Sequence, residues 1–300
     1  MKTLVTGGAG FIGSHLVDEL INRGHDVIVI DNEVSNGIEG SHWNSKAENY
    51  KLDIREYKKI RDLFQGVDFV FHLAAESRIQ PAIENPIQAV SVNSLGTCTV
   101  LQCAREAGVK RLMFSSTSAI YGNNQTPNQE TNSIDCINPY SVSKYDGEML
   151  CKMYSNLYGL ETIVFRYFNV YGDRQPIKGA HAPVMGVFLK QREEGKSLTV
   201  VGDGSQRRDF VNVKDVVEAN ILGATAPLQQ SEIGTVFNIG SGVNFSILEI
   251  ANMISESIVH LDSRVGESAE TLADISKAKT LLSWKPTMSL LQWINIQLAK

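Results

Sequence analysis

Short apolar runs alternate with longer amphipathic segments through the first half of the chain. The runs predict six strands, at Lys2–Thr6, Val27–Asp31, Tyr50–Leu52, Phe69–Leu73, Arg111–Ser115 and Thr162–Arg166. The amphipathic segments predict helices near Phe11–Arg23, Ile60–Phe64, Ile87–Ala107 and Ser143–Tyr158. Strands that are apolar throughout and alternate with helices are typical of a parallel sheet covered on both faces. We therefore expect an α/β fold with a doubly wound parallel sheet.

The alternation becomes less regular after about residue 170. The elements predicted there are a loop at Asp173–Pro183, a helix near Val184–Glu194, a strand at Leu198–Val201, a helix from the capping box Ser246-Ile-Leu-Glu249 to about Ser257, and two short helices around Trp284-Lys-Pro286. A chain of 300 residues exceeds one typical domain. We expect two domains, residues 1–170 and a smaller α/β part at residues 171–300, with some late segments returning to the first.

Net charge narrows the classes of partner. The chain has 28 Lys and Arg residues against 33 Asp and Glu residues, which gives a net charge of −5. A net negative charge repels a nucleic-acid backbone and an anionic membrane surface. No apolar run reaches the roughly 20 residues that span a bilayer. We expect the protein to bind neither nucleic acid nor membrane.

Cysteine spacing and the N-terminal residues suggest a location. None of the four cysteines (Cys98, Cys103, Cys136 and Cys151) forms a CxxC pair, and no His/Cys cluster has the spacing of a zinc site. We expect free thiols and no metal. The chain begins directly with a predicted strand and shows no leader with a cleavage site. These features favour a reducing cytoplasm.

A glycine loop follows the first strand directly. Thr6-Gly-Gly-Ala-Gly-Phe-Ile-Gly-Ser14 carries Gly7, Gly10 and Gly13 at GxxGxxG spacing, just before a predicted helix. The first glycine permits a tight turn, the second allows close approach to a pyrophosphate, and the third lets the helix pack on the sheet. Three glycines alone also fit an ordinary turn.

The ends of the following strands strengthen the prediction of a dinucleotide site. Asp31 ends the second strand, where a carboxylate can accept both ribose hydroxyls and would repel a 2′-phosphate, which favours NAD over NADP. Asp53-Ile54 follows the third strand, where its polar edge suits an adenine. Leu73-Ala-Ala75 closes the fourth strand with small side chains that leave room for the ligand. Taken singly, Asp53 also fits a turn and Ala74 and Ala75 fit core packing.

Tyr140-Ser-Val-Ser-Lys144 places a phenol and an ammonium on one face of a predicted helix. A neighbouring ammonium favours the phenolate and brings the pKa of Tyr140 toward working pH. Tyr140 then suits proton transfer with an alcohol. The segment Phe114-Ser-Ser-Thr-Ser-Ala-Ile-Tyr-Gly122 adds hydroxyl groups at the end of the fifth strand, where α/β sheets bind ligands. Such hydroxyls also commonly cap strand ends.

The motifs occur in the order found in extended short-chain dehydrogenases/reductases. Besides those above, the chain contains His72-Leu-Ala-Ala75, Arg166-Tyr-Phe-Asn-Val-Tyr-Gly172, Gly202-Asp-Gly-Ser-Gln-Arg-Arg-Asp209, Arg264-Val-Gly-Glu267 and Ala273-Asp-Ile-Ser-Lys277. Over nearly its whole length the chain resembles the nucleotide-sugar epimerase/dehydratase family, and most closely its UDP-sugar 4-epimerases. The resemblance implies a Rossmann-type domain that binds NAD and a C-terminal α/β domain that binds the substrate.

The resemblance also implies roles for individual residues. Thr117, Tyr140 and Lys144 are expected to be catalytic. The expected cofactor contacts are Gly7, Gly10, Phe11, Ile12, Gly13, Asp31, Asn32, Asp53, Ile54, Leu73, Ala74, Ala75, Asn93, Ser115, Tyr140, Lys144 and Phe168. The expected substrate contacts are Thr117, Tyr140, Asn169, Arg208, Arg264 and Thr271. The two arginines suit a diphosphate, because guanidinium groups pair bidentately with phosphate, although either also fits a surface salt bridge.

The carboxylates that other reactions of the family require are missing after Thr117, and this limits the reactions that the chain is expected to catalyse. Family 4,6-dehydratases typically have Thr-Asp-Glu, and the related decarboxylases Thr-Ser-Glu, where this chain has Thr117-Ser118-Ala119. His72-Leu-Ala-Ala-Glu-Ser77 is somewhat dehydratase-like, but the elimination needs the missing carboxylates. The resemblance therefore favours NAD-dependent 4-epimerisation of a UDP-sugar through a transient 4-keto sugar. UDP-glucose and UDP-galactose are the first candidates. Thr271, a small residue at a position that limits bulk in restrictive epimerases, leaves room for UDP-GlcNAc and UDP-GalNAc.

Other functions stay open at this point. One is another nucleotide-sugar oxidoreductase or a 4,6-dehydratase of the same family, and a second is a binding protein without activity. Retention of NAD through purification would favour an epimerase over a reductase that exchanges its cofactor. Family members usually form homodimers through the helix pair near Ile87–Ala107 and Ser143–Tyr158, so we expect a homodimer. The nucleotide, the sugar and the pathway are not determined by these motifs.

Overall fold

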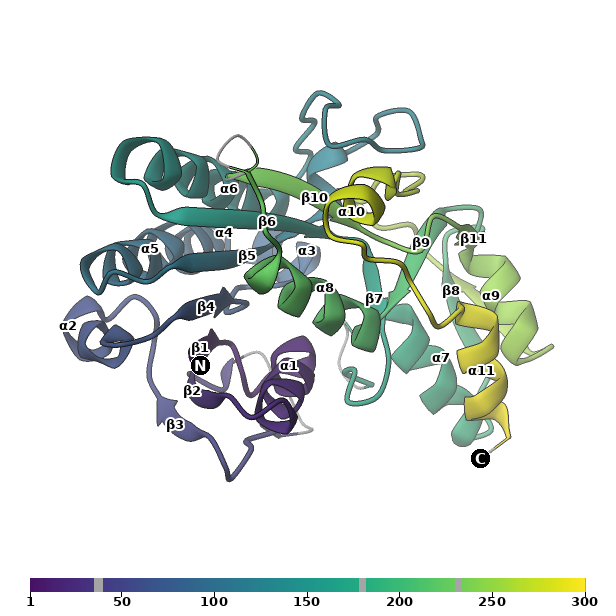
Figure 1. The fold of residues 1–300 in the computed structure, drawn as a ribbon. Helices are drawn as coiled ribbons and strands as arrows, with labels where there is room; N and C mark the ends of the chain where they lie inside the picture. Colours follow the sequence, from purple (N-terminus) through teal and green to yellow (C-terminus); the bar gives the residue numbers. More distant parts are fainter. Residues whose placement is uncertain (35–39, 178–181, 230–231, 233, 300) are drawn as a thin grey trace.

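The computed structural model describes residues 1–34, 40–177, 182–229, 232 and 234–299. Residues 178–181, which belong to the predicted loop Asp173–Pro183, lie outside the described residues. The described chain forms a large α/β layer structure with a smaller α/β part beside it (Figure 1). None of its described helices combines the length and the apolar composition needed to cross a bilayer.

Seven parallel strands form the large sheet, in the order β10-β6-β5-β4-β1-β2-β3. Their bounds are β1 Lys2–Thr6, β2 Asp26–Asp31, β3 Glu48–Lys51, β4 Phe69–His72, β5 Arg111–Thr117, β6 Glu161–Tyr167 and β10 Thr235–Ile239. The chain winds outward from β1 first through β2 and β3, and then back through β4, β5 and β6. The carboxyl ends of β1 and its two neighbours therefore flank the crevice where doubly wound sheets bind ligands.

Helices cover both faces of this sheet (Figure 1). Their bounds are α1 Phe11–Asn22, α2 Tyr57–Ile60, α3 Ile79–Glu84, α4 Pro86–Val90, α5 Gly96–Glu106, α6 Pro139–Tyr158, α8 Val213–Thr225 and α10 Ser276–Leu281, with short turns η2 Arg61–Phe64, η3 Ser91–Leu95 and η4 Ser118–Tyr121. On one face α1 packs against α8, and α10 lies on β10. On the other face α5 lies against β4, and α6 lies against β5 and β6.

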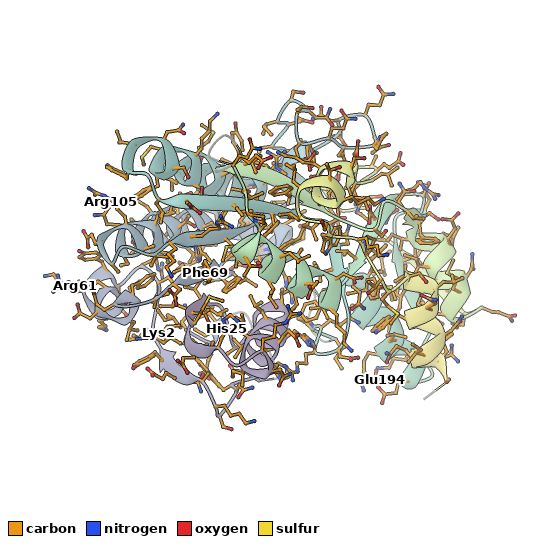
Figure 2. All side chains as sticks on the ribbon, viewed as in Figure 1. Lys2, His25, Arg61, Phe69, Arg105 and Glu194 are labelled. Carbon is orange, nitrogen blue, oxygen red and sulfur yellow. The ribbon has the colours of Figure 1, made fainter. Side chains whose placement is uncertain are left out.

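Alternate side chains along each strand fill the two layers between sheet and helices. On β4 and β5, Phe71 and Met113 belong to the core under α1 and α8, whereas Val70 and Phe114 belong to the core under α5 and α6. All four are buried. This alternation follows from the two-residue period of a strand with both faces covered. Side chains occupy the space between the layers, and charged groups such as Arg105 lie at the periphery (Figure 2).

The second part of the chain is built around a third core. Its elements are β7 Asn169–Tyr171, α7 Val184–Glu193, β8 Leu198–Val201, β9 Arg207–Asn212, β11 Asn244–Ser246, α9 Ile247–Ile254, β12 Ile258–Leu261 and α11 Leu290–Leu298. Strands β11, β9 and β7 form one small sheet, and β12 and β8 form another. Tyr171, Phe188 and Trp293 are buried between them and the helices.

The predicted doubly wound parallel sheet is confirmed, and among the differences from the predicted elements three concern the large sheet and the helices beside the site. Helix α6 begins at Pro139, four residues before the predicted Ser143, so Tyr140 lies in its first turn. The helix predicted at Ile87–Ala107 is divided into α4, the π-helical turn η3 and α5. The seventh strand, β10, was not predicted; it pairs with β6 from a distant part of the chain.

Candidate active site

The glycine loop joins β1 to the N-terminus of α1 with little space around it. Gly7 has φ +71°, and a Cβ atom there would lie 2.7 Å from the backbone nitrogen of Ala74. A Cβ atom on Gly13 would lie 2.1 Å from the carbonyl oxygen of Gly7. Only glycine therefore allows α1 to begin so close to the loop. In the described chain, α1 has no side-chain cap and no acidic residue in its first turn, so its N-terminal N–H groups are oriented for an anion.

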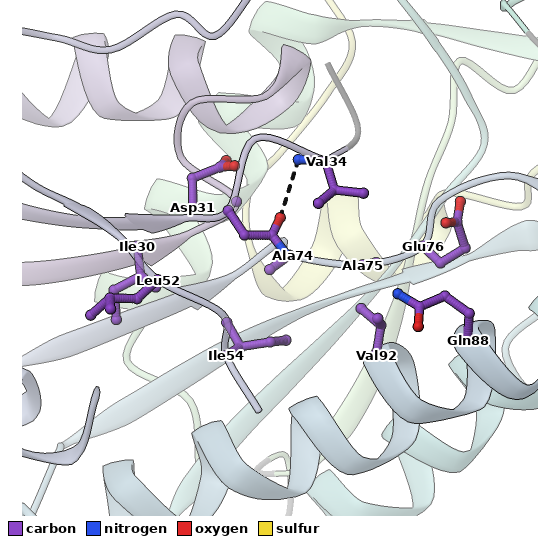
Figure 3. Close-up of a pocket in the computed structure, with 12 residues that line it drawn as sticks. Ile30, Asp31, Val34, Leu52, Ile54, Ala74, Ala75, Glu76, Gln88 and Val92 are labelled. Carbon is purple, nitrogen blue, oxygen red and sulfur yellow. Dashed lines mark hydrogen bonds between the residues drawn. The ribbon is translucent and has the colours of Figure 1, made fainter. Parts of the chain in front are cut away.

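Asp31 is a buried carboxylate at the end of β2. Its oxygens accept hydrogen bonds from the backbone nitrogens of Ala9, at 3.0 Å, and Glu33, at 2.7 Å. Burial raises the pKa of Asp31 above its usual value, although these hydrogen bonds oppose the shift. Two backbone donors fix the side chain and leave the carboxylate with further acceptor capacity. Asp31 is thus an acceptor held in place on the rim of a pocket (Figure 3).

This pocket runs across the carboxyl ends of β1, β2 and β4. It is lined by Gly7, Ile30, Asp31, Asn32, Val34, Leu52, Ile54, Ala74, Ala75, Glu76, Gln88 and Val92. Figure 3 shows Asp31 and Glu76 on opposite sides, with Gln88 and Val92 projecting from the helical segment below Glu76. Six residues of the lining were predicted as cofactor contacts, and the other six, Ile30, Val34, Leu52, Glu76, Gln88 and Val92, were not. Asp53, also predicted, lies beside the pocket with its carboxylate 2.6 Å from Arg55, which lowers the pKa of Asp53.

Thr117, Tyr140 and Lys144 come together at the end of β5 and the start of α6. Asn138 and Ser141 form the capping box that starts α6, and Pro139 is its first residue. Tyr140 is hydrogen-bonded to Thr117, whose hydroxyl oxygen also accepts a bond from the backbone nitrogen of Ala119 at 3.1 Å. The geometry therefore places the phenol directly beside the hydroxyl that the motif predicted.

The pKa of the Tyr140 phenol is shifted upward, whereas the sequence predicted a downward shift. Burial raises the pKa of Tyr140 above its usual value, Glu76 raises it further, and the hydrogen bond with Thr117 opposes the shift. The net shift is opposite to the predicted lowering, because desolvation of the buried phenolate outweighs the effects that favour it. Lys144 is itself buried, and burial lowers its pKa to about 8. Both groups thus titrate away from their solution values, as is common at active sites.

Asn93, predicted as a cofactor contact, joins the loop after β4 to the catalytic helix. Its side-chain oxygen accepts a bond from the backbone nitrogen of Glu76 at 2.8 Å. Its amide nitrogen donates to the carbonyl of Glu76 and to the hydroxyl of Ser143, both at 2.9 Å. Asn93 lies in the π-helical turn η3, a feature often found at functional sites. The side chain therefore positions the loop that carries Ala75 and Glu76.

Two further predicted cofactor residues lie at the ends of β5 and β6. The hydroxyl of Ser115 donates to the phenolic oxygen of Tyr167 at 3.1 Å, and Asn220 donates to the same oxygen at 2.7 Å. Phe168 is buried and stacks on Tyr121 with ring centres 6.3 Å apart. Both lie near the strand ends that flank Thr117.

Two predicted substrate residues, Asn169 and Thr271, contact the backbone of Asp209, whose carboxylate is buried. Asn169 donates to the carbonyl of Asp209 at 3.0 Å, and the hydroxyl of Thr271 accepts from its backbone nitrogen at 3.3 Å. The carboxylate itself accepts from the backbone nitrogens of Ser241, Gly242 and Ala273, at 2.6, 2.9 and 3.0 Å. Asp209 thus fixes β9 to two loops from distant parts of the chain.

Arg208 contacts the late segment, residues 264–269, that contains Arg264. Arg208 donates to the carbonyl of Ala269 at 3.3 Å and lies 3.4 Å from Glu267, while burial lowers the pKa of Arg208. Arg264 is exposed in the same segment. This segment reaches the catalytic helix, because Asn138 donates to the carbonyl of Gly266 at 2.8 Å. The structure therefore brings β9, the late segment and the start of α6 to one place.

Comparison with known proteins identifies the family. The family model described as the NAD dependent epimerase/dehydratase family matches residues 3–240. The chain belongs to the NAD-dependent epimerase/dehydratase family. Among curated proteins, it is 39% identical to a putative UDP-glucose 4-epimerase of Methanocaldococcus jannaschii, with 97% of this chain and 95% of that protein covered.

Solved structures show the same likeness. A UDP-glucose 4-epimerase of Thermotoga maritima with UDP-glucose has a TM-score of 0.94 and 35% identity, with 100% of this chain and 98% of that chain covered. A UDP-N-acetylglucosamine 4-epimerase of Methanobrevibacter ruminantium in complex with UDP-N-acetylmuramic acid has a TM-score of 0.90 and 31% identity, with 99% and 96% covered.

The residues of this epimerase/dehydratase family member fit the cofactor in the family's name. The close approach at Gly7 and Gly13 keeps side chains away from the place where a pyrophosphate would meet the N-terminus of α1. At the end of β2, Asp31 offers a buried carboxylate for ribose hydroxyls beside a pocket with small side chains at Ala74 and Ala75. The family relationship and this fit agree on NAD.

Proposed function

We propose that the protein interconverts the epimers at C4 of a UDP-sugar with NAD as its cofactor, through a transient 4-keto sugar. The observation that carries the proposal is the hydrogen-bonded pair of Tyr140 and Thr117, with Lys144 one turn further along α6. UDP-glucose and UDP-galactose are the first substrate pair. UDP-GlcNAc and UDP-GalNAc are the second, supported by the small Thr271 and by the relative that carries that activity in its name.

The residues that follow Thr117 support epimerisation over elimination of water. Ser118 and Ala119 continue into η4, and the backbone nitrogen of Ala119 donates to the hydroxyl of Thr117. Neither side chain can act as a carboxylic acid or base. A dehydratase needs such a pair, whereas 4-epimerisation needs one group that moves a proton at a single oxygen.

The proposed mechanism assigns one task to each catalytic residue. NAD, when bound, supplies a reversible two-electron oxidation of the sugar at C4. Tyr140 takes the proton of the 4-hydroxyl group and later returns it to the same oxygen. Thr117 hydrogen-bonds that oxygen and so holds it beside the phenol. Lys144 places a positive charge on the same helix face, which stabilises the phenolate when Tyr140 has lost its proton.

The binding roles are part of the same proposal. NAD is held by the glycine loop with Gly7, Gly10, Phe11, Ile12 and Gly13, by Asp31, Asn32, Asp53 and Ile54 at its adenosine end, and by Leu73, Ala74, Ala75, Asn93, Ser115, Tyr140, Lys144 and Phe168 toward the reacting end. The nucleotide sugar is held by Thr117, Tyr140, Asn169, Arg208, Arg264 and Thr271. Residues 1–170 form the cofactor domain and residues 171–300 the substrate domain, with α8 and β10 packed into the first.

We also propose a homodimer through α4, η3, α5 and α6. Large apolar side chains on these elements are exposed, with Ile87 82%, Leu95 56% and Leu157 66% accessible. Such side chains on neighbouring helices form a patch that a second copy would cover. Light scattering at micromolar concentration tests the dimer, and a monomer would contradict it.

All four cysteines are free, which supports a reducing, cytoplasmic location.

The experiment that tests the function is incubation of the purified protein with a panel of UDP-, dTDP- and GDP-sugars. Products are resolved by NMR, and no NAD is added beyond what the protein retains. We expect a UDP-hexose to convert to its C4 epimer. Loss of water from the sugar, or net consumption of cofactor, would contradict the proposal. Comparison of UDP-GlcNAc with UDP-glucose decides between the two substrate pairs.

Two variants complete the experiment. Tyr140→Phe removes the hydroxyl that moves the proton, so turnover should fall by orders of magnitude while NAD stays bound. Tyr158→Phe, at the other end of α6, is the matched control and should retain activity. Near-normal turnover of the Tyr140 variant would remove this residue from its role.

A further inference from the structure

Lys144 lies against the face of an aromatic ring. Its ammonium nitrogen is 4.3 Å from the ring centre of Phe114, a residue of β5 that is completely buried. Only 3% of Lys144 is accessible. The negative face of an aromatic ring attracts a cation at this distance, and the attraction is strongest where water is excluded.

The described part of the chain gives Lys144 no ion pair. The nearest candidate by sequence is Glu148, one helical turn further along α6, but its carboxylate binds the guanidinium of Arg166 at 2.7 Å and the hydroxyl of Ser116. Glu148 therefore points toward β5 and β6. A buried cation without an ion-pair partner is costly, and the Phe114 ring is the group that its ammonium nitrogen lies against.

Neighbouring residues pack closely around the Phe114 ring and hold it in this position. A Cβ atom on Gly147, in the same helix as Lys144, would lie 2.3 Å from the ring atom Cζ of Phe114. Glycine at this position admits the ring beneath α6. His72, the neighbour of Phe114 on β4, packs beside it with ring centres 5.6 Å apart and the two rings tilted by 42°. The Phe114 ring thus contacts both a histidine and a lysine.

His72 does not compete for the ring as a second cation. Its two ring nitrogens lie 2.7 Å from the hydroxyl of Thr6 and 2.9 Å from that of Thr97. Burial lowers the pKa of His72 to about 3, and the charge of Lys144 contributes to the shift. At neutral pH the three side chains therefore carry one positive charge, that of Lys144.

We propose that Phe114 is a positioning residue for catalysis, whose ring stabilises the ammonium of Lys144 in the active site in place of a carboxylate. The proposal rests on the proposed function, which gives Lys144 its role. A carboxylate counter-ion would cancel most of the field that Lys144 exerts on the Tyr140 phenolate. A ring stabilises the ammonium without adding a negative charge, so the full charge acts on the reacting group.

The ionisable groups that act on Lys144 come from three elements. They are His72 from β4, and Glu148 and Cys151 from α6, with Arg166 of β6 paired to Glu148. α4 and η3 also pack on α6 and contain no ionisable side chain. Tyr140 shares the helix face, and Glu76 acts on Tyr140. None of these groups changes when the Phe114 ring alone is altered.

The test places fluorine on the Phe114 ring, which weakens the negative electrostatic potential of the ring face and keeps the shape of the ring. Mono-, di- and trifluorinated phenylalanine is placed at position 114, and lysine is labelled with carbon-13 at Cε. The Lys144 resonance is the one lost in Lys144→Met. We expect its titration midpoint to fall stepwise with each fluorine, by about one pH unit across the series. Phe71 is the matched control, because it is equally buried but lies on the other face of the sheet.

A midpoint that stays constant across the series, or falls equally at position 71, would overturn the ring contact. The role of Phe114 in catalysis is tested on the same proteins by measuring kcat as a function of pH. The pH at which kcat changes on the alkaline side should move together with the titration midpoint of Lys144. If that pH does not move while the midpoint does, the positioning role is overturned. If the unmodified protein epimerises no UDP-sugar, the proposed function fails, but the NMR titration still decides the ring contact.

Discussion

Glu148 and Arg166 form a buried ion pair that joins the catalytic helix α6 to β6. Two bonds connect them, from Nε to Oε1 at 3.0 Å and from Nη2 to Oε2 at 2.7 Å. Their side chains are only 5% and 4% accessible. Removing one partner of such a pair leaves a buried charge uncompensated, whereas removing both does not.

Arg166→Met should therefore lower the free energy of unfolding by about 3–5 kcal/mol, measured by urea denaturation. The double variant Arg166→Met, Glu148→Leu should recover much of this loss. As a control, Arg23→Met breaks two exposed pairs, with Glu19 and with Glu218, and should cost at most about 1 kcal/mol. A double variant no more stable than the single one would show that the cost is not one of unpaired charge.

The glycine at the start of α1 is required by the backbone that faces it. Gly13→Ala forces a methyl group against the carbonyl of Gly7, so we expect overpacking to cost about 1–3 kcal/mol of stability. Because the displaced helix start is the proposed pyrophosphate site, NAD affinity in calorimetry should fall about tenfold or more. Gly24→Ala, at φ +79° but with open space around it, should lower stability without affecting NAD affinity. Equal losses of affinity would argue against the loop as the site.

Asp31 should set the choice between NAD and NADP. Asp31→Asn keeps the shape of the side chain and removes the charge, so the repulsion of a 2′-phosphate disappears. We expect weaker NAD binding and stronger NADP binding, measured as two dissociation constants at low and at physiological salt. Asp26→Asn, at the exposed start of the same strand, is the control. Unchanged preference in the Asp31 variant would place the ribose elsewhere.

His72 should make the fold sensitive to acid. Its pKa in the folded state is about 3, against an ordinary value of 6.5, so between these values the unfolded chain binds a proton that the folded protein does not. Stability is therefore unaffected well above pH 6.5 and is lost as the pH falls below it, by about 1.4 kcal/mol for each pH unit.

Urea denaturation between pH 7 and pH 4 measures this effect as a difference between proteins. In His72→Gln the free energy of unfolding should fall less steeply with acid than in the unchanged protein. His260→Gln, at an exposed histidine that contacts the carbonyl of Gly202, should keep the original slope. Parallel slopes for all three proteins would mean that His72 is protonated in the fold.

Five of the first six strands of the sheet could be predicted because each is an apolar run buried on both faces, whereas β3 is short and mostly exposed. Helix α8 was missed because most of its residues are buried, so its apolar residues form a broad face instead of a narrow stripe. The π-helical turn η3 could not be read either, because a shift of backbone hydrogen bonds leaves no trace in the apolar pattern. The start of α6 did have a signal, since Asn138 followed by Pro139 is typical of a helix N-terminus.

The parts of the site that local sequence determines were the easiest to predict. The glycine loop and Asp31 lie on consecutive elements, and the spacing of Tyr140 and Lys144 fixes them on one helix face. The partners of Arg208, in contrast, come from segments about sixty residues away in the chain, as with Glu267, so no local pattern indicates them. The same holds for Asn93, whose contacts with Glu76 and Ser143 depend on how α4, η3 and α6 pack.

The position of β10 beside β6 determines when the large sheet can be completed during protein synthesis. As the chain leaves the ribosome, β6 already follows β5, but its outer edge has no partner until α7, β8, β9 and α8 have also been made. An unpaired edge strand is prone to pair with other chains. We therefore expect the half-made protein to present this edge to chaperones, and release of a folded chain to wait for Thr235–Ile239.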